Sequence, residues 1–288
     1  MFKFGVDSWI WTEVFEEKDL WVIGKAKELG FEVLDINIAY PEKFPLKAVR
    51  EEQKKVGMEI VITTILEKRG NIISPDPEIR KVGVGLLKKL VDISNTLESR
   101  IFGGVNYAAW DYITGKPRTE QEWEWSVAAM KEVARYAEDT GTVTVCVEPI
   151  NRFESHFLNI AEDAIKYCKD VGTKNMKVHL DTFHMNIEEA DLVEAVKICG
   201  KEYLGYIHTC ESNRGIPGTG HVPWKGIFKA IKDIGFYGPL VIESFDPSME
   251  IFISGASFWR GAQFAETGEA LAIAGLKNLK KIASEIGE

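Results

Sequence analysis

The sequence predicts an α/β fold, a single (β/α)8 barrel that spans residues 1–288. Eight short runs rich in β-branched and aromatic residues alternate with eight amphipathic helical patterns, which is typical of a parallel sheet. No linker-like stretch divides the 288 residues. The segment after the first run, DSWIWT at 7–12, has no glycine, whereas a doubly wound nucleotide-binding fold needs a glycine-rich turn there. These three observations favour one closed barrel.

The elements follow one another in a regular order. Strands are expected at residues 3–10, 31–39, 58–66, 101–107, 142–150, 176–184, 203–211 and 239–245. Helices are expected between and after them, at residues 18–29, 45–56, 76–97, 120–140, 160–171, 188–199, 224–234 and 266–286, where apolar residues recur every three to four positions. Six glycines mark helix ends, because glycine readily adopts the left-handed backbone of a C-terminal cap: Gly30, Gly57, Gly141, Gly172, Gly200 and Gly235.

Charge and hydropathy exclude two classes of partner. The 35 basic and 44 acidic residues give a net charge of −9, whereas phosphate binding needs a concentrated basic face. No apolar run approaches membrane-spanning length. We therefore expect no nucleic-acid partner and no membrane partner.

The cysteines point to a reducing compartment. Cys146, Cys168, Cys199 and Cys210 show neither CxxC spacing nor the density of a disulfide scaffold. The N-terminus runs directly into a strand-like segment instead of a signal peptide. We expect reduced thiols and a cytoplasmic protein.

Ionisable residues gather at the ends of the last four predicted strands, where a (β/α)8 barrel carries its active site. Glu148, Asp181, His208 and Glu243 each follow an apolar run there. Side chains alternate across a strand, so these four are expected to face the barrel interior while their apolar neighbours face the helices. Three carboxylates in one confined space need a compensating cation. Oxygen-rich ligation with one imidazole predicts one divalent metal ion, Mn²⁺ first, with Co²⁺ and Mg²⁺ as alternatives.

Simpler interpretations exist for single residues. One carboxylate at a strand end often caps a helix or forms half of an ion pair. His179 is expected to face inward but deeper, as a core histidine with satisfied hydrogen bonds. Arg214 could pair with Glu211, and His184 could cap the next helix, although ligand contact is favoured for Arg214 and His184.

Three segments at these strand ends carry a family resemblance: EPINRFE at 148–154, LDTFHMNIEE at 180–189 and HTCESNR at 208–214. Together with GIPGTG at 215–220 and ESF at 243–245, they resemble the D-tagatose/D-allulose (D-psicose) 3-epimerases. Those ketose 3-epimerases belong to the TIM-barrel superfamily of sugar isomerases and epimerases. The resemblance follows the whole chain in strand order and is dense from about residue 103 onward.

The resemblance implies an isomerase that epimerises free ketoses at C3, such as D-fructose/D-allulose, D-tagatose/D-sorbose or L-ribulose/L-xylulose. It implies that Glu148, Asp181, His208 and Glu243 ligate the metal and that Glu148 and Glu243 are also the catalytic acid/base pair. Inverting a carbon next to a ketone needs a Lewis acid and one base on each face, which agrees with this assignment. It also implies a homodimer or homotetramer.

The resemblance also implies substrate contacts. Glu154, His184 and Arg214 would hydrogen-bond the O1–O3 end of the sugar, and Trp110 would form an apolar wall at the far end. The first strand departs from the family, because Asp7 and Ser8 stand where aromatic residues are usual. As a hypothesis, the Asp7 carboxylate contacts the C4–C6 end of the substrate and sets the preferred ketose.

Three other functions compete with this one. A similar one-metal barrel could be an aldose–ketose isomerase, which moves a proton between C1 and C2. Metal-dependent DNA endonucleases share the superfamily, but they use more histidine ligands and a basic surface, unlike this chain with five histidines and a charge of −9. A non-catalytic sugar-binding protein would not need two opposed glutamates.

Overall fold

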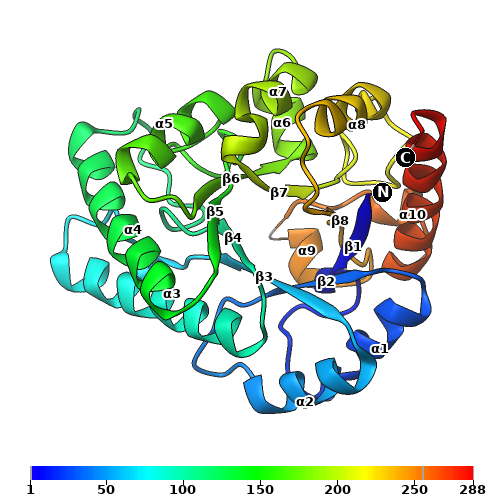
Figure 1. Cartoon of the computed structure of the whole chain (residues 1–288), viewed down its shortest axis with the longest axis horizontal. Helices are drawn as coiled ribbons and strands as arrows, with labels where there is room; N and C mark the ends of the chain where they lie inside the picture. Colours follow the sequence, from blue (N-terminus) through cyan, green and yellow to red (C-terminus); the bar gives the residue numbers. More distant parts are fainter. Residues whose placement is uncertain (1, 255, 288) are drawn as a thin grey trace.

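Eight parallel strands close one barrel in the computed structural model, which describes residues 2–254 and 256–287 (Figure 1). Each strand pairs with its neighbours in sequence, and β1 pairs with β8 to complete the circle. The predicted TIM barrel is therefore confirmed. The strands are β1 Lys3–Asp7, β2 Val33–Asn37, β3 Glu59–Ile65, β4 Ile101–Val105, β5 Thr144–Val147, β6 Met176–Asp181, β7 Leu204–His208 and β8 Pro239–Ile242.

Helices surround the barrel and connect its strands. The α-helices are α1 Trp21–Glu28, α2 Leu46–Val56, α3 Pro77–Thr96, α4 Glu120–Thr140, α5 Ala161–Val171, α6 Thr182–Glu188, α7 Leu192–Tyr203, α8 Trp224–Asp233, α9 Glu250–Ser254 and α10 Gly268–Glu285. Short 3-10 turns are η1 Ser8–Ile10, η2 Glu17–Asp19, η3 Lys68–Gly70 and η4 Gly261–Gln263. Within the described residues, each helix is too short or too polar to span a membrane.

Two side-chain caps explain where the predicted boundaries were wrong. The first strand stops at Asp7, because its carboxylate accepts a hydrogen bond from Trp9 N at 2.6 Å and starts η1. The sixth stops at Asp181, whose carboxylate caps α6 through the backbone amides of Phe183 and His184. The short helix α6 consequently begins where the sixth strand was predicted to continue to residue 184, and the helix predicted for 188–199 is α7.

The barrel interior is layered, as side-chain alternation requires. Cys146, Tyr206 and Val241 pack together inside the barrel in one small cluster with residues from β2 and β3. Glu148, His208 and Glu243 lie two residues further along the same strands and so occupy the next layer toward the strand ends.

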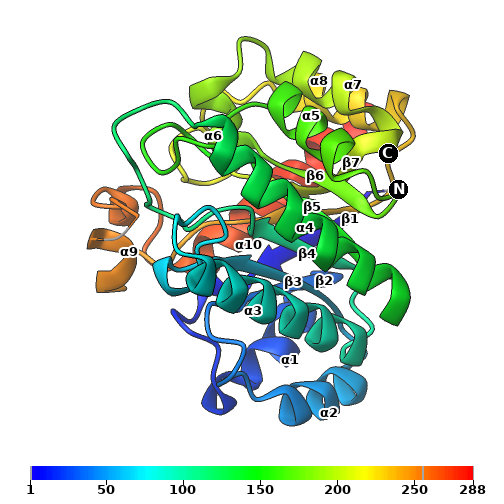
Figure 2. The ribbon, with the colours of Figure 1, turned by 90° about the vertical axis from the view of Figure 1, so that its left-hand side faces the viewer.

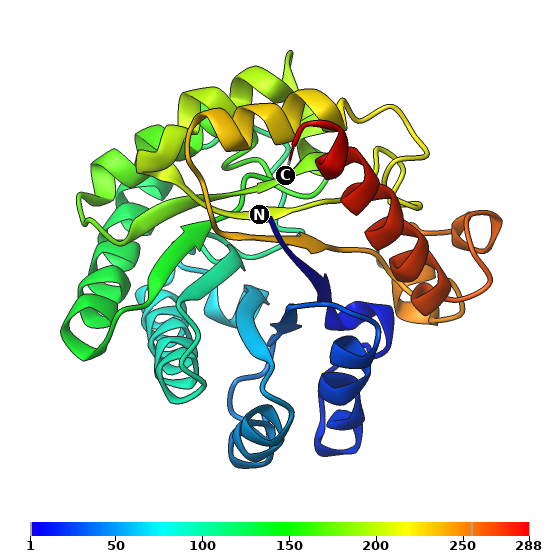
Figure 3. The ribbon, with the colours of Figure 1, turned by 45° about the vertical axis from the view of Figure 1, so that its right-hand side comes forward.

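The two ends of the barrel differ. Figure 2 shows α9 beyond the strands at one end, while the two chain termini lie at the other end. The termini lie near one another (Figure 3). The last helix, α10, packs against α8, β8 and η1 and so covers the seam where the first and last strands meet.

Candidate active site

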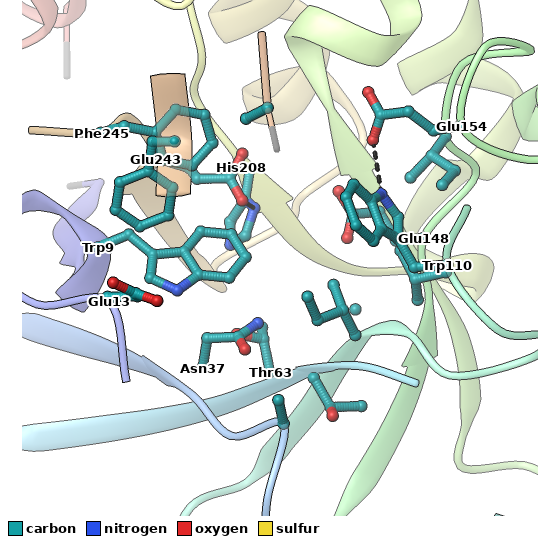
Figure 4. Close-up of a pocket in the computed structure, with 18 of the residues that line it drawn as sticks. Trp9, Glu13, Asn37, Thr63, Trp110, Glu148, Glu154, His208, Glu243 and Phe245 are labelled. Atoms are coloured by element: carbon teal, nitrogen blue, oxygen red, sulfur yellow. Dashed lines mark hydrogen bonds and ion pairs between the residues drawn. The ribbon is translucent and has the colours of Figure 1, made fainter. Parts of the chain in front are cut away.

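A cavity of about 350 Å³ opens at the strand-end side of the barrel. Pockets of roughly 300–1,000 Å³ are usual for small ligands, so this one suits a monosaccharide. Figure 4 shows Glu243, His208, Trp9 and Phe245 on one side and Glu148 beside Trp110 on the other. Its lining comprises Trp9, Glu13, Val14, Asn37, Ala39, Tyr40, Thr63, Thr64, Ile65, Glu67, Gly104, Val105, Trp110, Glu148, Ile150, Glu154, His184, His208, Arg214, Glu243, Phe245, Phe252 and Ala256.

The ends of β6, β7 and β8 bring three predicted metal ligands together. Donor atoms of Asp181, His208 and Glu243 all lie within 4.8 Å of one another. His208 Nδ1 lies 3.5 Å from Glu243 Oε1 and 4.0 Å from Asp181 Oδ2. Within the described part of the chain, this buried nitrogen has no hydrogen-bond partner. An imidazole nitrogen facing two carboxylates is a donor set that fits a divalent metal ion.

Glu148, the fourth predicted ligand, borders this group. It follows β5, and its donor atom lies within 4.8 Å of Asp181 and His184 in one set and of His179 and His208 in another. Its side chain is buried, as are those of the other three predicted ligands. The four side chains thus lie near one another, and Glu148 is within this distance of Asp181 and of His208.

The two glutamates have opposite electrostatic surroundings. Burial raises the pKa of Glu148 well above its ordinary value, and Glu243 and Asp181 add to this while His208 opposes it. Burial also raises the pKa of Glu243, but Arg214 and His208 outweigh it and hold that pKa well below the ordinary value. Carboxyl groups whose pKa values are pushed apart in one pocket are typical of acid/base pairs.

Arg214 is the cation of this site. Its Nη1 donates to Glu243 Oε2, and its Nη2 lies 3.2 Å from His184 Nε2. The guanidinium also lies over the rings of Phe183, at 4.3 Å, and Phe245, at 4.9 Å. Its backbone is left-handed, with φ of 56°, a conformation that a non-glycine residue keeps only where its surroundings enforce it.

Glu211 stabilises the loop after β7, and with it the left-handed backbone at Arg214. The Glu211 side chain is fully buried and accepts hydrogen bonds from groups of the loop. The Arg214 side chain instead donates to Glu243, so the alternative of an Arg214–Glu211 ion pair is wrong. The donors to the Glu211 carboxylate are Ser212 N at 2.8 Å, Gly218 N at 2.8 Å, Val222 N at 3.2 Å and Trp224 Nε1 at 3.0 Å.

We expect Glu211→Gln to lower the free energy of unfolding by about 1–3 kcal/mol, because the amide nitrogen cannot accept from the buried donors that the lost oxygen served. Thermal unfolding followed by circular dichroism would show a melting temperature several degrees lower. Glu51→Gln, on the exposed face of α2, is the matched control and should not change it. Equal melting temperatures for the two variants would contradict this role.

Glu154 and its partners form the other polar end of the pocket. Trp110 Nε1 donates to Glu154 Oε2 at 2.8 Å (Figure 4), and Asn151 Nδ2 donates to Oε1 at 2.7 Å. The backbone N–H of Asn151 lies 3.1 Å from His184 Nδ1, toward which it donates. Nε2 lies 4.0 Å from Glu148 Oε1, and His184 is therefore a residue of α6 that faces the pocket.

Known proteins were compared with the chain as a whole. Residues 23–282 match the family model described as "Xylose isomerase-like TIM barrel". A D-psicose 3-epimerase of Ruminiclostridium cellulolyticum is 37% identical over 249 residues, which are 84% of each protein. An L-ribulose 3-epimerase of Mesorhizobium japonicum is 32% identical, covering 90% of this chain and 88% of the relative. The chain belongs to the ketose 3-epimerase family.

Solved structures of this family agree with the barrel. The D-allulose 3-epimerase of Methylomonas sp. superposes with a TM-score of 0.91 at 28% identity and covers 98% of both chains. A D-psicose 3-epimerase of Clostridium cellulolyticum, solved with D-tagatose, gives 0.88 at 31% identity over 98% of this chain and 99% of that one. Members of this family are isomerases, so the predicted enzyme class is confirmed.

Asp7 lies elsewhere than predicted in this ketose 3-epimerase family member. Its side chain is fully buried and is not among the groups that line the pocket. One carboxylate oxygen caps Trp9 N, and the other has no hydrogen-bond partner within the described residues. The chain turns into η1 directly after Asp7, so Trp9 and Glu13 reach the pocket in its place. The hypothesis that Asp7 contacts the substrate tail is therefore not supported.

His179 is buried as predicted but is not satisfied. Both ring nitrogens lack a hydrogen-bond partner among residues 2–254 and 256–287. Nδ1 lies 3.5 Å from Glu148 Oε2, and the ring packs edge-on against His208 with centroids 4.2 Å apart. Burial, the largest influence, lowers the pKa of His179 well below its ordinary value, so the ring is neutral at neutral pH. His179 thus sits against two predicted metal ligands of this family member.

The second and third strands contribute polar residues to the pocket that were not predicted from the sequence. Asn37 ends β2, Thr63 and Thr64 lie in β3, and all three line the cavity. The sequence could have indicated these three residues, because they are polar residues within otherwise apolar strands. Phe252 of α9 also lines the cavity.

Proposed function

We propose that this protein epimerises free ketoses at C3 with the help of one divalent metal ion. The opposed placement of Glu148 and Glu243 across the pocket, with His208 beside Glu243 (Figure 4), supports the proposal most directly. The relatives are named D-psicose 3-epimerase, ketose 3-epimerase and L-ribulose 3-epimerase, and each name places the reaction at C3 of a ketose. D-Fructose/D-allulose, D-tagatose/D-sorbose and L-ribulose/L-xylulose are the candidate substrate pairs.

In this mechanism, Glu148 and Glu243 exchange one proton each with C3 of the ketose. One carboxylate removes the C3 proton and generates an enediolate, and the other returns a proton to the opposite face, with the roles reversed in the reverse direction. Asp181 and His208 would hold the metal together with both glutamates. When bound, the ion supplies positive charge to the ketose oxygens and so stabilises the enediolate.

The polar end of the pocket would orient the substrate. Glu154, His184 and Arg214 offer an acceptor, an imidazole ring and a cationic donor close to the two glutamates. We propose that they bind the O1–O3 end of the sugar. Trp110 donates to Glu154, so it would lie at this same end and not at the far end as the sequence analysis expected.

Product analysis of a ketose panel tests the proposed function. Purified protein with added Mn²⁺ is incubated with D-fructose, D-tagatose and L-ribulose, and the products are separated by chromatography. The C3 epimer of at least one ketose is the expected product. An aldose product would indicate an aldose–ketose isomerase, and unchanged sugars throughout would contradict the proposal.

Replacing Trp110 by phenylalanine should raise the KM for the ketose by about tenfold. The variant keeps an aromatic wall but removes the N–H donor to Glu154, and a hydrogen bond to a charged group contributes about 1.5 kcal/mol. Initial rates over a range of ketose concentrations measure this effect. Trp21→Phe, on the exposed side of α1, is the control, and equal KM values for both variants would contradict the role of Trp110.

Three further sequence-based expectations stay predictions. They are Mn²⁺ as the preferred ion, a homodimer or homotetramer, and a cytoplasmic location. Analytical ultracentrifugation would decide the second, because a sedimenting species of the 32.4 kDa monomer would contradict it.

A further inference from the structure

Asp35 is a fully buried carboxylate inside the barrel, in the middle of β2. It is one of two aspartates paired in register at this point, because Asp7 of β1 lies opposite it. A charged group placed among apolar strand residues lowers stability unless its hydrogen bonds are satisfied. Its position on β2 keeps it out of the motifs that carry the family resemblance.

Three side chains donate to the Asp35 carboxylate. Thr63 Oγ1 donates to Oδ1 at 2.8 Å, and Tyr206 OH donates to Oδ2 at 2.6 Å. His208 Nε2 lies 2.9 Å from the same Oδ2. A carboxylate oxygen only accepts hydrogen bonds, so in the third bond the donor is the Nε2–H of His208.

This bond fixes both the tautomer and the orientation of the His208 ring. With the proton on Nε2, the lone pair lies on Nδ1, and Nδ1 faces Glu243 and Asp181 at 3.5 and 4.0 Å. The ring also packs against His179, at a centroid distance of 4.2 Å, and against Tyr206, at 5.1 Å. Histidines that bind metals almost always donate their second N–H to a carboxylate, a backbone carbonyl or a water molecule, and Asp35 is a partner of the first kind.

We propose that Asp35 is a positioning residue, which holds His208 with Nδ1 aimed at the metal and thereby sets the metal affinity of the site. The inference rests on the proposed function, since it assumes that His208 is a metal ligand. Tyr206 and Thr63 act one step further out by holding the Asp35 carboxylate in place. Asp35 itself touches neither the substrate nor the reacting atoms.

Mn²⁺ binding to the metal-free protein tests this role without reference to turnover. Free Mn²⁺ is followed by electron paramagnetic resonance during a titration of wild type and Asp35→Asn. Asparagine keeps the shape but can present an N–H to His208, so the ring loses its fixed tautomer. We expect the Kd for Mn²⁺ to rise by about 10–100-fold. We also expect kcat to return to within a few-fold of wild type when Mn²⁺ is saturating.

Two further variants keep the test decisive. Tyr206→Phe removes one support of Asp35 and should weaken Mn²⁺ binding in the same direction, so it replaces Asp35→Asn if that variant does not fold. Ser126→Ala removes two buried hydrogen bonds, to Tyr107 O and Tyr167 OH, each 2.6 Å long, among residues that do not line the pocket. It should lower the melting temperature without changing the Kd.

The outcomes separate the two levels of inference. An unchanged Kd in Asp35→Asn, with a wild type that binds Mn²⁺, would overturn the role of Asp35 and leave the proposed function intact. A wild type that epimerises ketoses but binds no Mn²⁺ would overturn both the metal site and this inference.

Discussion

Replacing Glu148 by glutamine is expected to lower kcat for ketose epimerisation by about 10²–10⁴-fold, the usual contribution of a positioned acid or base. Glutamine fills the same volume and can still offer one oxygen, but it cannot take up a proton. Steady-state rates with saturating ketose and Mn²⁺ measure the effect. Glu132→Gln, on the exposed part of α4, is the matched control and should keep wild-type kcat.

Glu243→Gln extends this prediction because two bases act on opposite faces. Each single variant should lose interconversion of the two epimers while keeping hydrogen exchange at C3 with only one of them, the epimer whose proton faces the remaining carboxylate. Exchange with both epimers in either variant would point to one base that serves both faces. Full turnover in both variants would contradict the assignment and favour a sugar-binding protein.

Removing the metal is expected to lower kcat by more than about 10³-fold, because the enediolate would lose its principal source of positive charge. Protein dialysed against EDTA is assayed before and after Mn²⁺, Co²⁺ or Mg²⁺ is added back, and its residual metal content is measured by mass spectrometry. Activity should return with the ion, and the ranking of the three ions identifies the preferred one. Undiminished turnover in protein shown to be free of metal would contradict a metal-dependent reaction.

The barrel could be predicted from the sequence because its evidence is local. Each strand is a short apolar run and each helix a periodic pattern, and both signals survive without knowledge of the fold. The errors lie where one polar side chain outweighs the pattern. Asp7 and Asp181 each cap the next turn, so a strand that seemed to continue ends there.

The site, like the fold, has a part that could be predicted from local sequence and a part that could not. Residues at or just past the ends of β5 to β8 could be predicted because barrel geometry gathers them. In the structure, the donor atoms of Asp181, His208 and Glu243 lie within 4.8 Å of one another. Contacts across the barrel could not be found. The bond from Tyr206 to Asp35 joins residues 171 positions apart, and sequence spacing contains no information about it. The packing of α9 over the pocket is equally non-local.

Proton exchange in D2O tests the central claim most directly. Protein freed of metal by EDTA is mixed with D-fructose, D-allulose, D-tagatose, D-sorbose and L-ribulose, and NMR spectra are recorded before and after Mn²⁺ is added. The account predicts deuterium at C3, together with the C3 epimer, only when Mn²⁺ is present. Deuterium at C1 or C2 with formation of an aldose, or the same C3 exchange without any metal, would contradict it.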